Sequence, residues 1–224
     1  MSLLVEAYEE LPQPRPGDDP ALCRAGREEA VGRFRRAVRE RYTEGTLARI
    51  LQSHLHPTHR RAAAVALGLV GSMASNPVMA AALHDPDESV RRTVADVIWE
   101  VWFRGDGDES GELRQAVGLP DVGERLAACD DLIARRPQFA EAYNQRAIQH
   151  YVRGEYARAV SDCEAALRLN PYHFGAASGL GQCYVRMHKP RAALRAFAHA
   201  LELHPGLSHL HEVMAALRDT LGGE

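Results

Sequence analysis

The sequence predicts an all-α fold, a right-handed solenoid of helical hairpins, on three observations. Aromatic residues make up only 6% of the 224 residues, so the apolar content of 46% is mainly Ala, Leu and Val, which suits close-packed helices better than a sheet. One segment recurs at a spacing of 34 residues in the C-terminal half, and another at 31 residues in the N-terminal half. Fixed periods of this size are typical of repeat architectures.

The C-terminal period relates residues 140–171 to residues 174–205. Small residues recur at Ala147 and Gly181, where the two helices of a hairpin must approach closely, and each copy ends in a proline that cannot continue a helix. This spacing and pattern resemble the tetratricopeptide repeat. One period earlier, residues 124–137 align as the second helix of a degenerate copy.

Residues 106–221 are therefore expected to form a tetratricopeptide domain with one degenerate and two regular repeats. The first helix of the degenerate copy should lie in residues 106–120, which are interrupted by Gly and Pro. A capping helix should follow Pro205, because apolar residues have helical spacing there: Leu210, Val213, Met214 and Leu217.

The N-terminal period relates residues 60–71 to residues 91–102. In each copy a turn containing proline precedes an Arg-Arg pair and a helix. This arrangement resembles the HEAT repeat and implies HEAT-like helical repeats over residues 27–105. In the second copy, Asp85 is expected to be the N-cap of the helix, with Pro86 at the first helical position.

Residues 1–26 are expected to form an extended acidic tail, because LPQPRPGDDP holds four prolines in ten positions. Such a tail could occupy the chain's own binding groove. The next segment, residues 24–41, predicts an amphipathic helix with seven arginines and three glutamates, a net charge of +4 in a chain of net charge −3. This helix could attract a nucleic-acid backbone. A solvated helix or an intramolecular partner for the acidic tail is favoured, because aromatic residues are not interleaved to stack bases.

No catalytic or nucleotide-binding motif such as GxSxG, HExxH or GxGxxG occurs in the sequence. His54, His56 and His59 fall at a predicted turn and lack the converging ligands of a zinc site, so polar turn residues are favoured. Cys129 and Cys163 occupy an apolar mid-helix position and are expected to be buried thiols. The sequence therefore predicts no enzyme, no metal and no cofactor.

The tetratricopeptide resemblance implies a concave groove lined by the first helix of each hairpin. The residues expected to bind a peptide there are Glu141, Asn144, Ile148, Tyr151, Ser178, Gln182, Val185 and Arg186. Asn144 and Gln182 would hydrogen-bond an extended backbone, while Ile148 and Tyr151 would make apolar contacts. The subtype that grips a C-terminal carboxylate uses lysines, which this groove lacks.

The favoured function is a non-enzymatic adaptor that binds a protein or peptide partner, in the cytoplasm of a bacterium with a GC-rich genome. The sequence shows no signal peptide and no apolar run long enough to span a membrane. Two rivals are a nucleic-acid-binding HEAT-like protein and a HEAT-like lyase that handles a tetrapyrrole, which would need a reactive exposed Cys or His. The aromatic residues Trp99, Trp102 and Phe103 are expected to fill the junction of the two repeat types, and a homodimer is also compatible with the sequence.

Overall fold

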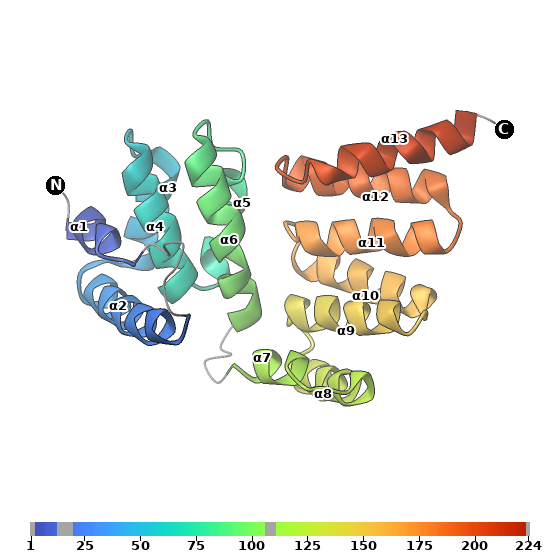
Figure 1. The fold of residues 1–224 in the computed structure, drawn as a ribbon, viewed down its shortest axis with the longest axis horizontal. Helices are drawn as coiled ribbons and strands as arrows, with labels where there is room; N and C mark the ends of the chain where they lie inside the picture. Colours follow the sequence, from blue (N-terminus) through green and yellow to red (C-terminus); the bar gives the residue numbers. More distant parts are fainter. Residues whose placement is uncertain (1–2, 13–19, 106–110, 223–224) are drawn as a thin grey trace. The chain divides into compact units, whose positions relative to one another are not determined.

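The computed structural model describes residues 3–12, 20–105 and 111–222, and these ranges contain helices and no strand (Figure 1). The helices are α1 (Leu3–Glu9), α2 (Pro20–Arg41), α3 (Glu44–Ser53), α4 (Pro57–Val70), the 3-10 helix η1 (Met73–Ser75), α5 (Asn76–Ala82), α6 (Glu88–Arg104), α7 (Glu112–Val117), α8 (Val122–Arg135), α9 (Ala140–Val152), α10 (Tyr156–Leu169), α11 (Phe174–Arg186), α12 (Pro190–Leu203) and α13 (His209–Gly222). The predicted all-α fold of helical hairpins is confirmed. None of the described helices is long and apolar enough to cross a membrane.

The chain divides into two compact units, residues 1–101 and residues 102–224. In the first unit, α3 packs against α4 and α5, while α1 and α2 pack against α4. The core between these helices is aliphatic and includes Leu47, Leu67 and Met79, each 0% exposed. Burial of such side chains contributes roughly 1.5–3 kcal/mol each relative to exposure in water.

The prediction that residues 1–26 form an extended tail is wrong for the described part. Residues 3–9 form α1, whose Leu4, Val5 and Tyr8 are buried, and α2 already begins at Pro20. The apolar face of α1 is covered by its neighbours, and Arg61 of α4 donates a hydrogen bond of 2.8 Å to the Tyr8 hydroxyl. Because α1 is packed against the first unit through these side chains, it does not act as an extended ligand of the chain's own groove. The prolines at positions 14 and 16 lie outside the described residues.

Three turns between consecutive helices share one pattern of arginine hydrogen bonds. In each, an arginine of the following helix donates from Nη1 to the backbone carbonyls six and five residues before it, at 2.6–2.7 Å and 3.1 Å. These arginines are Arg60, Arg91 and Arg125. The sequence signal for the third turn is a repeated PDxxxR motif, at residues 86–91 and 120–125. The α7–α8 hairpin, expected to be a degenerate tetratricopeptide repeat, therefore has a turn like those of the HEAT-like copies.

Asp85 does not cap α6, contrary to the sequence-based expectation. Its carboxylate accepts two hydrogen bonds of 2.7 Å from the guanidinium of Arg60, one repeat earlier. The N-cap is Asp87, whose Oδ1 accepts from the backbone N–H groups of Ser89 and Val90 at 2.9 and 3.2 Å. Asp85 Oδ1 also accepts from the backbone N–H of Asp87 at 2.9 Å, but α6 begins only at Glu88, so the N-cap lies two residues later than predicted.

The second unit stacks its helices in chain order, as Figure 1 shows for α9 to α13. The hairpins α9–α10 and α11–α12 pack closely at the predicted small residues. A Cβ atom on Gly181 would lie 2.4 Å from a ring carbon of Phe197, so a side chain there is excluded. Cys129 and Cys163, at the positions equivalent to Phe197, are 0% and 2% exposed and belong to the core as predicted.

The 34-residue period is also seen in the backbone of the hairpin turns. Gly154 follows α9 with φ 76°, and His188 holds the equivalent left-handed conformation after α11 with φ 55°. Glycine adopts this region freely, whereas a residue with Cβ is strained by roughly 1–2 kcal/mol.

We therefore expect His188→Gly to raise the free energy of unfolding by about 1 kcal/mol, and Gly154→Ala to lower it by about the same amount. Urea unfolding followed by circular dichroism measures both changes. A loss of stability in His188→Gly would mean that the exposed imidazole makes a contribution larger than the backbone strain.

Candidate functional site

The predicted groove residues separate into a buried pair and an exposed set. Exposed or partly exposed side chains on neighbouring helices α9 and α11 form what we call the α9–α11 face: Ile148, Tyr151, Val152, Ser178, Gln182, Val185 and Arg186. Ile148 is 45% exposed, and Val152, which was not among the predicted groove residues, is 62% exposed. Val152 lies one helical turn after Ile148, so the two form an apolar stripe.

Glu141 and Asn144 do not belong to this face, and their prediction as groove residues is corrected here. They are 1% and 4% exposed. The Glu141 carboxylate accepts hydrogen bonds from Asn144 Nδ2 at 3.1 Å, Gln145 Nε2 at 2.6 Å and His173 Nε2 at 2.6 Å. A carboxylate surrounded by three donors inside the protein holds helices together rather than contacting a ligand.

The position of the proton on His173 follows from its hydrogen bonds. The backbone N–H of Ala176 donates to His173 Nδ1 at 3.1 Å, so Nδ1 is an acceptor and Nε2 carries the proton that is donated to Glu141. The imidazole ring of His173, the N-cap of α11, links that helix to α9. It also stacks on Trp102, the first residue of the second unit, with ring centroids 4.3 Å apart. The sequence did not indicate that His173 contacts Glu141, because the two residues are 32 positions apart and lie in different repeats.

Arg186 is the most distinctive charged group of the face. Its guanidinium lies 4.7 Å from the ring centroid of Tyr156 and 5.6 Å from that of Tyr151, and the two rings are 5.5 Å apart. A hydrogen bond with Tyr151 raises the pKa of Arg186. Among the described residues no carboxylate forms an ion pair with Arg186. Two tyrosines thus hold an exposed cation in place without neutralising it.

Other cations near α9 form ion pairs within the protein. Arg146 forms a bidentate pair with Asp162 at 2.7 and 2.8 Å and also donates to Asp130 at 2.6 Å. Glu155 pairs with Arg153 at 3.0 Å and with Arg158 at 3.1 Å. Arg146 thus joins α8, α9 and α10, whereas Arg186 is an exposed cation of the α9–α11 face that has no ion pair among the described residues.

The histidine cluster lies at the α3–α4 turn, as predicted. His54 is the C-cap of α3, and its Nδ1 accepts a hydrogen bond of 3.1 Å from the backbone N–H of His56, the N-cap of α4. The rings of His54 and His59 stack with centroids 3.9 Å apart. Among the described residues, no group of three or more His, Cys, Asp or Glu side chains is arranged to hold a metal ion.

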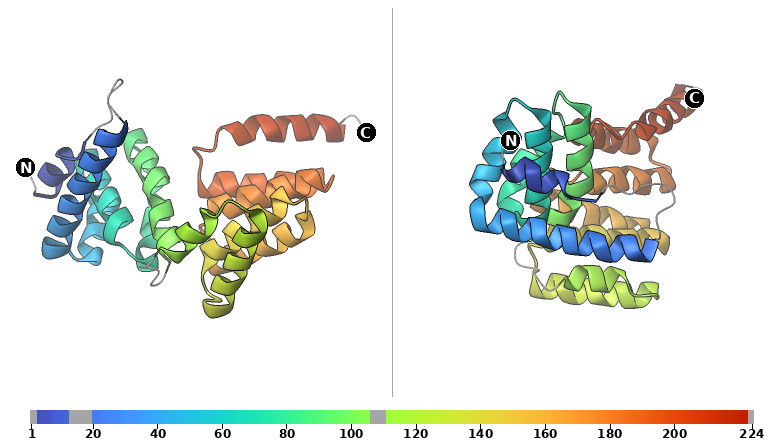
Figure 2. Two further views of the ribbon diagram at one scale, coloured as in Figure 1. Left: turned by 60° about the horizontal axis from the view of Figure 1, so that its bottom comes forward. Right: turned by 60° about the vertical axis from the view of Figure 1, so that its left-hand side comes forward.

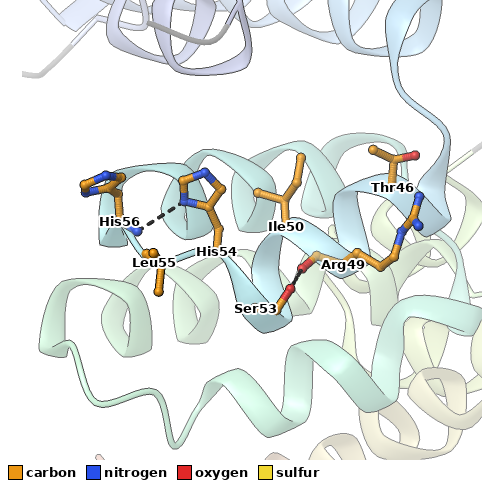
Figure 3. A pocket seen from close by; sticks show the side chains of 7 residues that line it. All are labelled: Thr46, Arg49, Ile50, Ser53, His54, Leu55 and His56. Carbon is orange, nitrogen blue, oxygen red and sulfur yellow. Dashed lines mark hydrogen bonds between the residues drawn. The ribbon is translucent and has the colours of Figure 1, made fainter.

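A shallow hollow of about 620 Å³ lies beside this turn (Figure 3). Its lining is Thr46, Arg49, Ile50, Ser53, His54, Leu55 and His56. Leu55 is 89% exposed. The hydrogen bonds drawn in Figure 3 are local, since Ser53 donates to the Arg49 carbonyl and His56 to His54. The hollow therefore lacks the convergent polar groups that orient a small ligand.

Stability is expected to decrease in acid at this turn. Burial and the neighbouring His54 and His56 lower the pKa of His59 below its ordinary value of 6.5. The unfolded chain then binds a proton more readily than the folded one, so stability is lost as the pH falls below 6.5 through the folded pKa. Thermal unfolding at about pH 7.5 and about pH 5.5 should show this loss in the wild type and less of it in His59→Phe, which keeps the ring stack. An equal loss in both proteins would contradict the assignment.

The described cysteines are core residues rather than nucleophiles. Cys129, Cys163 and Cys183 are free thiols and at most 2% exposed. Burial raises the pKa of Cys129 to about 11, so its thiol stays protonated at neutral pH. A lyase that attaches its substrate to an exposed thiol gains no support from these three residues. The side chain of Cys23 lies outside the described part of the structure.

Two family models match the sequence. The model of HEAT repeats matches residues 44–136, and the model of the tetratricopeptide repeat matches residues 153–217. The HEAT match includes all three arginine-closed turns and extends 31 residues beyond the limit at residue 105 that the sequence pattern had indicated.

The curated relatives are similar over a minor part of the chain. A TPR repeat-containing protein of Rhizobium etli is 33% identical over 94 residues, which cover 42% of this chain and 46% of the relative. Superkiller complex protein 3 of Mus musculus is 32% identical over 81 residues, 36% of this chain and 5% of that protein. The chain thus spans less than half the length of these relatives.

Solved structures with similar chains are also tetratricopeptide proteins. The first such domain of Spaghetti, solved with an HSP90 peptide, is 22% identical and covers 45% of this chain and 80% of its own, with a TM-score of 0.44. A thermophilic protein of Thermus thermophilus is 21% identical and covers 88% of this chain and 93% of its own, with a TM-score of 0.40. The chain is thus an all-α protein of helical hairpins in which residues 44–136 match the model of HEAT repeats and residues 153–217 match the model of the tetratricopeptide repeat.

Proposed function

We propose that this protein is a non-enzymatic adaptor that binds a peptide segment of a partner protein on the α9–α11 face. The observation that carries the proposal is the exposed Arg186, held between Tyr151 and Tyr156 and left without a described carboxylate partner. The exposed Ile148 and Val152 lie on α9, the helix that also carries Tyr151. A segment with an acidic group and an apolar side chain fits this combination.

Repeat folds of both kinds are compatible with a protein-interaction scaffold, because stacked hairpins present extended surfaces. The face has an aromatic-held arginine next to apolar side chains, and such groups often dominate the free energy of protein binding. We place this adaptor in the cytoplasm, where free thiols such as the three described cysteines stay reduced.

The test is affinity capture from a lysate of the source cells, comparing the wild type with Ile148→Ser/Arg186→Gln. The control is Val213→Ser/Arg218→Gln on α13, which removes the same kinds of exposed side chain elsewhere in the unit. We expect a partner that the wild type and the control retain and that the face variant loses by about tenfold or more. Equal recovery by all three proteins would place any binding outside this face.

A further inference from the structure

The long helix α2 carries a surface that the proposed function does not use. Its inner side is fixed by Ala30, Phe34 and Val38, which are 6%, 2% and 1% exposed and lie one helical turn apart. The helix packs through them on α1 and α4, and Figure 2 shows it in blue beside α1 in the first unit. The opposite side of α2 is therefore held facing solvent.

That outer side is strongly basic. Six arginines and three glutamates lie from Arg27 to Arg41, so this stretch has a net charge of +3. The whole chain has a net charge of −3, and the residues outside this stretch therefore carry −6. We use the name arginine row for Arg35, Arg36 and Arg39, all of them exposed. The only ion pair recorded on the described part of this helix joins Arg33 and Glu29 at 2.8 Å.

The acidic N-terminal residues do not neutralise the row in the described structure. Glu6, Glu9 and Glu10 belong to or follow α1, and none of them forms an ion pair with an arginine of α2 among the described residues. The expected pairing of tail and helix is therefore not found for residues 3–12. Guanidinium groups that form no ion pair with the described residues, aligned along one helix, are suited to phosphate, which arginine contacts through two parallel N–H groups.

The composition of the exposed side distinguishes among polyanions. Every exposed residue from Gly26 to Arg41 is Gly, Arg or Glu. Protein interfaces have apolar or aromatic centres, and single-stranded nucleic acids are bound by stacking on aromatic rings, neither of which this surface offers. It also lacks neutral hydrogen-bonding side chains for the 2′-hydroxyl groups of RNA. Duplex DNA, with one negative charge per about 1.7 Å of its axis, requires only closely spaced cations.

We propose that the arginine row of α2 binds the phosphate backbone of double-stranded DNA without regard to sequence. From Arg27 to Arg41 the helix is about 21 Å long, so the arginines run past several phosphates of one duplex. This activity is independent of the α9–α11 face, and together the two surfaces would let the protein bring a bound partner to DNA.

The test is fluorescence anisotropy of a labelled duplex of about 20 base pairs, titrated with the full chain at several salt concentrations. The variant Arg35→Gln/Arg36→Gln/Arg39→Gln removes the row. The control Arg191→Gln/Arg195→Gln/Arg218→Gln removes three exposed arginines from α12 and α13. Circular dichroism checks that the proteins remain folded, and their thermal unfolding should agree because all six side chains are exposed.

We expect the row variant to bind DNA less tightly. Each lost phosphate contact should reduce the steepness of the plot of log K against log salt concentration by about 0.9, so the three substitutions together should reduce it by about 2.7. Between about 50 and about 200 mM salt the wild type should then lose roughly 40-fold more affinity than the row variant. The control should behave as the wild type. Duplexes of different sequence should bind alike.

Several results would overturn the proposal: no binding by the wild type at low salt, an unchanged slope in the row variant, or an equal effect in the control. Tighter binding of duplex RNA than of duplex DNA would assign the surface to RNA instead. Displacement of DNA by poly-glutamate at equal charge concentration would indicate a surface for acidic proteins.

Discussion

Replacing Arg60 by alanine is expected to lower the free energy of unfolding of the first unit by about 3–5 kcal/mol, the range measured when one partner of a buried ion pair is removed. The side chains of Arg60 and Asp85 are 10% and 7% exposed. Without Arg60, the Asp85 carboxylate would lose its guanidinium inside the protein, and the carbonyls of His54 and Leu55 would lose their donor. Urea unfolding by circular dichroism should show a lower midpoint with an unchanged slope.

Arg91 is a matched control for Arg60, because it occupies the equivalent position in the next repeat. It donates to the carbonyls of Asp85 and Pro86 but has no recorded carboxylate partner among the described residues. We expect Arg91→Ala to cost about 1–2 kcal/mol, the effect of its hydrogen bonds alone. Equal losses in Arg60→Ala and Arg91→Ala would mean that the pair with Asp85 contributes nothing net.

Replacing Glu141 by alanine is expected to destabilise the second unit by about 3–5 kcal/mol, because two buried donors and one partly buried donor would lose their acceptor at once. Glu141→Gln is the sharper test. Its amide would direct N–H groups at a donor of His173, Asn144 or Gln145, so that about 1–3 kcal/mol should be lost without any change in size.

The matched control for Glu141 is Gln182→Ala on the α9–α11 face. Because Gln182 is exposed, its loss should change the free energy of unfolding by no more than about 0.5 kcal/mol. Hydrogen exchange would locate the effect of Glu141→Ala in α9 and α11. If Glu141→Gln left stability intact and weakened partner binding, Glu141 would be a ligand contact after all.

The sequence by itself determined the all-α class and the pairing of helices in the repeated hairpins, but it did not predict α1. The 34-residue period predicted that a small residue is required at Gly181. The structure confirms this, because the ring of Phe197 occupies the space that a side chain at position 181 would need. The same pattern placed Cys129 and Cys163 in the core. Helix spacing also predicted that Ile148 and Gln182 are on one side of their hairpins, and both are exposed there. That this side binds a partner stays a prediction.

Only the tertiary structure decided which polar residues are buried. Glu141 and Asn144 have the spacing of exposed positions, but His173 reaches Glu141 from the next repeat and Trp102 covers His173. Asp85 likewise has the spacing of an N-cap, yet Arg60 draws it into a contact between repeats. Periodicity fixes the side of a helix on which a residue lies. Which neighbour covers that side depends on contacts between residues far apart in the chain, and these form only when the hairpins stack.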